Sequence, residues 1–218
     1  MRGTPVNRGP FIVFEGIDGA GTTTQSRLLA ERLHRERPAV RVLLTAEPTA
    51  GPVGALIRQV LRERLVGKTL PGEQIPFDRR ALALLFAADR LDHVACEVMP
   101  LVKAGWAVIS DRYVLSSLAY QSLDATLEWV ETLNAFAPPP DILFFLECEP
   151  QVALARIRSS RAGGEVFETQ ETLTRVAAAY LDALPRVKAG RVVSLRAERQ
   201  KEEVAQAVWR EVEAFFQG

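Results

Sequence analysis

Lysine is scarce in this 218-residue chain: Lys68, Lys103, Lys188 and Lys201 are the only four, and arginine supplies the remaining positive charge. The 27 basic and 27 acidic side chains cancel. The chain therefore has no overall field that would attract a polyanion or an anionic membrane surface. We expect neither nucleic acid nor a membrane as a partner.

Cysteine, histidine and long apolar runs are also few or absent. Cys96 and Cys148 have no spacing typical of a disulfide framework or a zinc site, and their apolar contexts predict reduced core residues. His34 and His93 have charged neighbours, and we expect both at the surface rather than as catalytic bases. There is no 18-residue apolar run, and the first residues lack the apolar stretch of a signal peptide. These absences predict a cytoplasmic protein.

Short apolar runs alternate with longer helical patterns along the chain. The runs that predict strands cover residues 11–15, 40–45, 106–110, 141–147 and 191–195. Several are apolar at successive positions, which is typical of strands buried on both faces. No hairpin signal joins them, and the segments 67–76 and 137–141 are predicted to be loops. The pattern predicts a single α/β domain over residues 1–218, a three-layer sandwich in which helices flank a parallel sheet of about five strands.

A glycine-rich loop, GIDGAGTTTQ (16–25), follows the first predicted strand. Gly16, four further residues, Gly21 and two threonines nearly match a phosphate-binding loop. Glycines would let backbone N–H groups approach an anion, and the next helix would point its positive end toward it. The residue after Gly21 is Thr22, where such loops carry a lysine. Taken alone, the lysine-free pattern fits a plain strand-to-helix turn equally well.

Polar residues follow two other predicted strands, at the edge where parallel sheets bind ligands. Thr23 stands where a hydroxyl would bind magnesium, and Asp111 could hold the same ion directly or through water. Arg112 could bind a phosphate through two parallel hydrogen bonds. On its own, an Asp-Arg pair is more often a surface ion pair. Residues 47–49, Glu-Pro-Thr, by themselves predict only a turn.

Together these segments resemble the thymidylate kinases, nucleoside monophosphate kinases that phosphorylate dTMP. The resemblance covers nearly the whole chain and rests on FEGIDGAG, AEPTAGPVGALIR, LLFAADRLDHV, VISDRYVLSSLAYQS and RIRSSRAGGEVFE. The long DRY segment, at its proper distance after the FAADR helix, is the most specific of these. The resemblance implies a P-loop NTPase-type fold with a short lid at about 156–168. It also implies ATP as donor, dTMP as acceptor, magnesium as cofactor and a homodimer.

The same resemblance implies an acceptor site. Phe86 would stack on thymine, and Arg90, one helical turn later, would hydrogen-bond a carbonyl oxygen of the base. Tyr120 would lie against the 2′ position of the sugar, where a ribose hydroxyl would crowd it. Core packing is the alternative for Phe86, and an exposed helix arginine is the alternative for Arg58. The implied dTMP-binding set is Asp18, Glu47, Pro48, Arg58, Phe86, Arg90, Arg112, Ser116, Ser117, Tyr120 and Gln121.

On the donor side, the lid would close over the phosphates and exclude water. The family often has an Asp-Arg dipeptide in the lid where this chain has Glu165 and Val166, so one possible lid arginine is absent. The implied ATP-binding set is Gly16, Ile17, Asp18, Gly19, Ala20, Gly21, Thr22, Thr23, Thr24 and Arg156. The implied catalytic set is Asp18, Arg112, Arg158 and Arg161, and the implied magnesium ligands are Thr23 and Asp111.

The missing lysine leaves three hypotheses. A lid arginine or Arg112 could supply the charge and preserve an active kinase. The chain could instead bind nucleotides without efficient transfer, as a regulatory or vestigial module. A third hypothesis, prompted by EPTAGP where the family more often has EPGGT, is an active kinase for another deoxynucleoside monophosphate.

Overall fold

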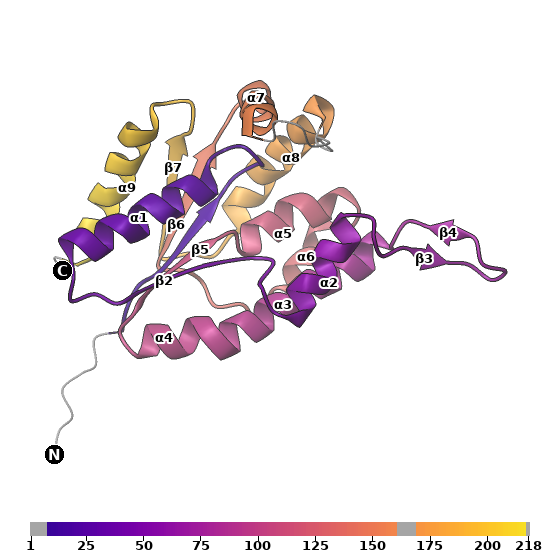
Figure 1. The fold of residues 1–218 in the computed structure, drawn as a ribbon, viewed down its shortest axis with the longest axis horizontal. Coiled ribbons are helices and arrows are strands. Elements are labelled where there is room, and N and C mark those ends of the chain that lie inside the picture. Colours follow the sequence, from indigo (N-terminus) through magenta and orange to yellow (C-terminus); the bar gives the residue numbers. More distant parts are fainter. Residues whose placement is uncertain (1–7, 161–168, 217–218) are drawn as a thin grey trace, which may run out of the picture.

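The computed structural model describes residues 8–160 and 169–216. Its central sheet has five parallel strands in the order β2-β5-β1-β6-β7 (Figure 1). The prediction of a five-stranded parallel sheet is confirmed, and β1 and β5 are buried along their whole length, including the polar residues with which they end. The strands are β1 (Phe11–Glu15), β2 (Val42–Ala46), β5 (Ala107–Asp111), β6 (Ile142–Glu147) and β7 (Arg191–Arg196).

Helices cover both faces of this sheet (Figure 1). Helices α1 (Thr22–Glu36) and α9 (Lys201–Phe215) pack together on one face, whereas α5 (Val114–Tyr120) and α8 (Gln170–Ala183) pack together on the other. This division follows from right-handed crossovers between parallel strands. The chain crosses the sheet in one direction from β1 to β2 and in the opposite direction from β5 to β6, so the connecting helices lie on opposite faces. The glycine loop after β1 therefore opens between the two helical layers, at the point where ligands bind in such sheets.

The remaining helices lie in the connections between strands. Asp78 begins α3 by accepting hydrogen bonds from the backbone N–H groups of Arg80 and Ala81. A π-helical turn, Val94–Val98, then joins α3 to α4 without a break. These elements are α2 (Pro52–Leu61), α3 (Arg79–His93), α4 (Met99–Lys103), α6 (Leu127–Leu133), α7 (Pro150–Ser160) and the short 3₁₀ turns Gln121–Leu123 and Leu184–Arg186.

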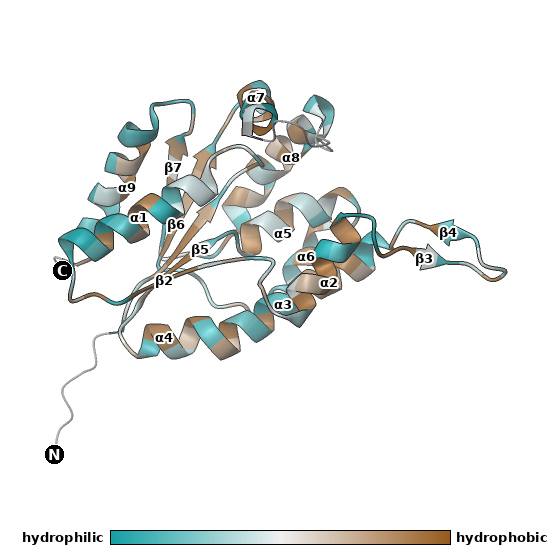
Figure 2. Cartoon of the chain, viewed as in Figure 1, coloured by the Kyte–Doolittle hydropathy of each residue, from teal (hydrophilic) through white to brown (hydrophobic). Residues whose placement is uncertain are grey.

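The apolar side chains form two clusters. The larger one lies between the sheet and its helices and contains the interiors of β1, β5 and β6. Figure 2 shows these central strands mostly in brown, whereas the helices alternate between apolar and polar faces. The smaller cluster, Ile57, Val60 and Leu82, joins α2 to α3, and Phe86 packs against it.

Two sequence predictions about these regions are wrong. The segment 67–76 is not only loop: it contains β3 (Gly67–Lys68) and β4 (Gln74–Ile75), an antiparallel hairpin that projects beyond α2 (Figure 1). Strands of two residues are too short to show an alternating pattern, so no hairpin signal is visible in the sequence. Cys148 is buried as expected, but Cys96 is exposed. Within the described residues, no helix combines the length and apolar character needed to cross a membrane.

Candidate functional site

The glycine loop has a backbone that only glycine adopts easily. Gly19 and Gly21 have φ angles of +82° and +100°. A Cβ atom at Gly19 would lie 2.4 Å from the carbonyl oxygen of Ala153, so α7 packs directly on the loop. Gly21 is the N-cap of α1, and no side chain of the described residues caps that end. The first N–H groups of the helix are thus available to an anion, as the loop pattern predicts.

Thr23 and Asp111 meet beside this helix end. The Thr23 hydroxyl donates a hydrogen bond to Oδ2 of Asp111. The other carboxylate oxygen, Oδ1, is buried and has no hydrogen-bond partner among the described residues. A buried oxygen without a partner next to a hydroxyl suits Mg²⁺, which prefers oxygen ligands. The described residues contain no group of three or more His, Cys, Asp or Glu side chains that could hold a metal.

Arg112 joins the segment after β5 to the glycine loop. Its backbone has a φ of +78°, rare for a residue with a side chain. Its guanidinium donates to the carbonyl oxygen of Gly16, to Asp18 Oδ1 at 2.6 Å and to the Tyr180 hydroxyl at 2.8 Å. Burial disfavours its charge, but the neighbouring tyrosines and carboxylates raise the pKa of Arg112 well above its usual value. A permanent positive charge therefore lies at the mouth of the loop.

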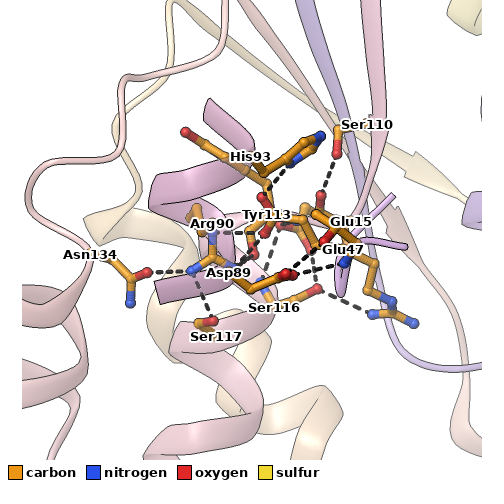
Figure 3. Close-up of polar contacts among 12 residues, drawn as sticks. Glu15, Glu47, Asp89, Arg90, His93, Ser110, Tyr113, Ser116, Ser117 and Asn134 are labelled. Atoms are coloured by element: carbon orange, nitrogen blue, oxygen red, sulfur yellow. Dashed lines mark hydrogen bonds and ion pairs between the residues drawn. The ribbon is translucent and has the colours of Figure 1, made fainter. Parts of the chain in front are cut away.

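Glu15 is the centre of a buried network beside Arg112, and this role was not anticipated from the sequence. This carboxylate at the end of β1 is fully buried. It accepts hydrogen bonds from the Ser116 hydroxyl at 2.5 Å and from the N–H of Tyr113 at 2.9 Å (Figure 3). Burial raises the pKa of Glu15, and the hydrogen bond from Ser116 works in the opposite direction. The signal available in the sequence was a charged residue, Glu15, at the end of an otherwise apolar strand.

Arg90 is the centre of a second buried network. Its side chain is 2% exposed, and its Nε and Nη2 atoms both lie 2.8 Å from Oε2 of Glu47. It also donates to three groups of the DRY segment and α6 (Figure 3): the carbonyl oxygen of Tyr113, the hydroxyl of Ser117 and the side-chain oxygen of Asn134. Each of its three nitrogens therefore has an acceptor within the protein. A bond from Arg90 to a nucleobase would have to replace one of these.

The turn after β2 is held by residues of two helices. Asp89 accepts hydrogen bonds from the N–H of Thr49 at 2.7 Å and from its hydroxyl at 2.6 Å. Arg58 donates to the carbonyl oxygens of Pro48 and Thr49 at 3.0 and 2.6 Å. Arg58 is thus occupied with this turn, and Asp89 was not anticipated from the sequence.

The other predicted acceptor residues lie on α3, at the end of α5 and directly after α5. Phe86 is half-buried on α3. The hydroxyl of Tyr120 accepts the N–H of Asp18 at 3.2 Å, and its ring meets Tyr180 edge to face. Gln121 has a buried side-chain oxygen with no partner among the described residues. The structure thus brings together the glycine loop, the turn at Glu47 and the start of α5.

His93 is not at the surface, and that prediction is wrong. The residue is 4% exposed, because it lies on the face of α3 that packs toward β2. Its Nδ1 is 3.1 Å from Oε1 of Glu47, and its Nε2 is 2.9 Å from the hydroxyl of Thr45. Charged neighbours in the sequence suggested exposure, but Asp89 and Arg90, one turn earlier on the same side of the helix, are buried as well.

A cavity of about 200 Å³ adjoins the glycine loop on the side of α9. Arg156 of α7 lies beside it and donates to the carbonyl oxygens of Ala197 at 2.7 Å and Gly19 at 3.5 Å. Arg158 is exposed on the same helix, whereas Arg161 and the rest of the predicted lid, 161–168, lie outside the described residues. The residues that line the cavity are Ala20, Gly21, Thr24, Gln25, Arg156, Ala197, Arg199, Lys201 and Val204.

A parallel sheet with a glycine loop at the start of α1, an Asp-Thr pair beside it and a buried arginine facing it defines a P-loop phosphotransferase of the nucleotide kinase type. A sequence model of the thymidylate kinase family, described as "Thymidylate kinase", matches residues 14–208. The chain belongs to the thymidylate kinase family.

Its relatives agree with this assignment. A protein of Thermococcus kodakarensis, described as a probable thymidylate kinase, is 45% identical over 172 residues, 78% of this chain and 82% of its own length. One of Pyrococcus abyssi with the same description is 40% identical over 191 residues, 87% and 90% of the two chains. A third, from Pyrococcus horikoshii, is 46% identical over 152 residues, 69% and 71% of the two chains.

Proposed function

We propose that this protein transfers the γ-phosphate of ATP to dTMP and forms dTDP, the reaction of its family. The observation that carries the proposal is the meeting of three segments at one edge of the sheet: the loop 16–21, the turn at Glu47 and the segment that begins at Asp111. Together they offer a helix end for the donor phosphates, a fixed cation at Arg112 and a group of buried polar side chains beside which an acceptor would bind. Family membership favours this function over a binding module.

The reaction needs alignment and charge neutralisation more than a general base, because a phosphate oxygen is already a competent nucleophile. We propose that the N–H groups of the loop hold the donor phosphates, and that Arg112 holds the phosphate of dTMP against them. Asp18, already paired with Arg112, would receive the sugar 3′-hydroxyl. Phe86 and Tyr120 would enclose the base and sugar, so that a ribonucleotide fits poorly.

Magnesium is proposed as the cofactor, held by Asp111 and Thr23. When bound, it would neutralise charge on the phosphates. For the charge that Thr22 lacks, α7 is the proposed source. Arg156 already reaches the loop, and Arg158 lies on the same helix toward the predicted lid. Cations that approach the phosphates only when a lid closes stabilise the transition state selectively.

We also propose a cytoplasmic homodimer. Leu56 of α2 and Leu84 and Leu91 of α3 are 38%, 51% and 39% exposed, a high proportion for large apolar side chains. They lie on the two helices joined by the smaller apolar cluster. A second copy of the chain would remove them from water.

The proposal is tested by following ADP release with ATP, Mg²⁺ and one monophosphate at a time, with dTMP, CMP and AMP in parallel. We expect dTMP to give the highest kcat/KM, because Phe86 and Tyr120 would fit a pyrimidine on a deoxyribose, and Tyr120 would crowd the 2′-hydroxyl of CMP and AMP. Equal turnover of AMP or CMP would contradict the substrate assignment. Binding of ATP without transfer to any monophosphate would support the binding module instead.

A further inference from the structure

His93 lies behind Glu47 and is not itself among the predicted dTMP-binding residues. It is the last residue of α3, one helical turn after Arg90, and the π-helical turn begins immediately after it. π-helical turns within α-helices often occur at functional sites. This position makes His93 the link between α3 and the strand β2.

The histidine fixes the carboxylate of Glu47. Oε1 of Glu47 is 3.1 Å from Nδ1 of His93, whereas Oε2 is 2.8 Å from the guanidinium of Arg90 (Figure 3). An ionised carboxylate only accepts hydrogen bonds, so Nδ1 must carry the proton in this contact. One oxygen of Glu47 is thereby assigned to His93 and the other to Arg90.

The far side of the ring is also held. Nε2 lies 2.9 Å from the Thr45 hydroxyl and 3.1 Å from Oε2 of Glu97. The Thr45 hydroxyl donates to the same Glu97 oxygen at 3.1 Å. Because Thr45 is only two residues before Glu47, both ends of the imidazole are tied to the segment that enters the acceptor site. The ring therefore has little freedom to rotate.

We propose that His93 is a positioning residue of the acceptor site, which sets the orientation of Glu47 and, through it, of Arg90. This inference rests on the proposed function. Arg90 in turn holds the Tyr113 carbonyl and the Ser117 hydroxyl at the start of α5. The series His93, Glu47, Arg90 thus connects the turn after β2 to the segment that carries Arg112, and it acts on the acceptor rather than the donor.

The test compares three substitutions. His93→Asn retains an N–H donor close to the position of Nδ1, His93→Gln moves the donor to about the position of Nε2, and His93→Leu has nearly the shape of asparagine without a donor. We expect His93→Leu to raise KM for dTMP about tenfold, because a buried acceptor on Glu47 loses its partner. kcat and KM for ATP should change less than about threefold. His93→Asn should recover most of the loss, and His93→Gln should not.

A matched control is Glu97→Gln. It changes the carboxylate on the far side of the imidazole ring and leaves the contact between His93 and Glu47 in place. It should leave KM for dTMP within about twofold of the wild-type value. Thermal unfolding of each variant identifies any that does not fold, and the contrast between His93→Asn and His93→Gln decides the matter if His93→Leu is one of these.

Equal KM values for dTMP in the Asn and Gln variants, or a loss that falls equally on ATP, would overturn the inference. Its failure is distinguishable from failure of the proposed function. In the first case the wild-type enzyme phosphorylates dTMP and the variants do so equally well. In the second, the wild-type enzyme does not phosphorylate dTMP at all.

Discussion

Asp111 has one carboxylate oxygen on Thr23 and a second that is buried without a partner. If this oxygen binds Mg²⁺, removing its charge should slow transfer. We predict that Asp111→Asn lowers kcat at least about tenfold, because the ion loses an anionic ligand beside the donor phosphates. The affinity for dTMP, measured by calorimetry without ATP, should change much less. An Asp111→Asn enzyme with the wild-type rate, or full activity in a chelator, would remove Asp111 and the metal from the mechanism.

The burial and the charged contacts of His93 also predict that the stability of the fold depends on pH. Burial alone would lower the pKa of His93, but the hydrogen bond to Glu47 and the charges of Glu47, Glu97 and Asp89 outweigh it and raise the pKa. A group whose pKa is raised in the folded protein stabilises the fold most below its unfolded value, near 6.5, and loses this contribution as pH rises through the folded value.

The free energy of unfolding of the wild type, relative to His93→Asn, should therefore be largest below about pH 6.5 and decrease at higher pH. Urea unfolding of both proteins across this range measures the difference. A constant difference would show that His93 does not gain a proton on folding.

At the scale of elements, α7 is the part of the structure that approaches the lysine-free loop. Arg156→Ala should reduce kcat at least about tenfold, and so should Arg158→Ala or Arg161→Ala if the lid closes as its sequence predicts. The effect on dTMP affinity should be smaller, because these arginines serve the donor. Adding Thr22→Lys to any of these variants should recover part of the lost kcat, since the new lysine and the removed arginine would serve overlapping roles. Arg175→Ala, on α8, is the control and should keep its activity. The explanation fails if all three arginines of the lid region can be removed without slowing transfer.

The elements show what the sequence could predict and what it could not. Short, mainly apolar runs located all five strands within two residues. The pattern is clearest in β1, β5 and β6, which are buried, whereas β2 and β7 are partly exposed. The hairpin at β3 and β4 was missed because it has no apolar face to bury. The order of the strands was also out of reach, since the sequence carries the connections but not the pairings.

Site residues in the loops that directly follow strands could be predicted from the sequence, whereas residues on helices packed against the sheet could not. Arg112 and Thr23 were found because loop patterns fix their positions. Asp89, Tyr180 and His93 were not, because their role depends on which helix face packs against the sheet. Arg90 was predicted as a base contact, and the structure adds that it is held by four protein groups.

At the scale of the whole molecule, the exposed leucines of α2 and α3 predict a dimer. Leu84→Glu should convert it to a monomer, because a charge in a closed apolar interface loses its hydration. Leu181→Glu is the matched control, since Leu181 is 52% exposed on α8, away from these helices. Sedimentation velocity distinguishes the two outcomes. A wild-type monomer, or a Leu84→Glu dimer of unchanged affinity, would place the interface elsewhere or exclude it.

The central claim is that a loop with Thr22 in place of lysine still supports transfer of phosphate to dTMP. The most direct measurement is the rate of ADP release by the wild-type protein with ATP and Mg²⁺, compared across dTMP, dUMP, dCMP and dGMP. The account predicts turnover that requires Mg²⁺ and a clear preference for dTMP, because α7 would supply the charge, and Glu47, Arg112 and Tyr120 lie at the same edge of the sheet as the loop. ATP binding with no transfer to any of the four would contradict it, and a preference for another monophosphate would contradict the choice of acceptor.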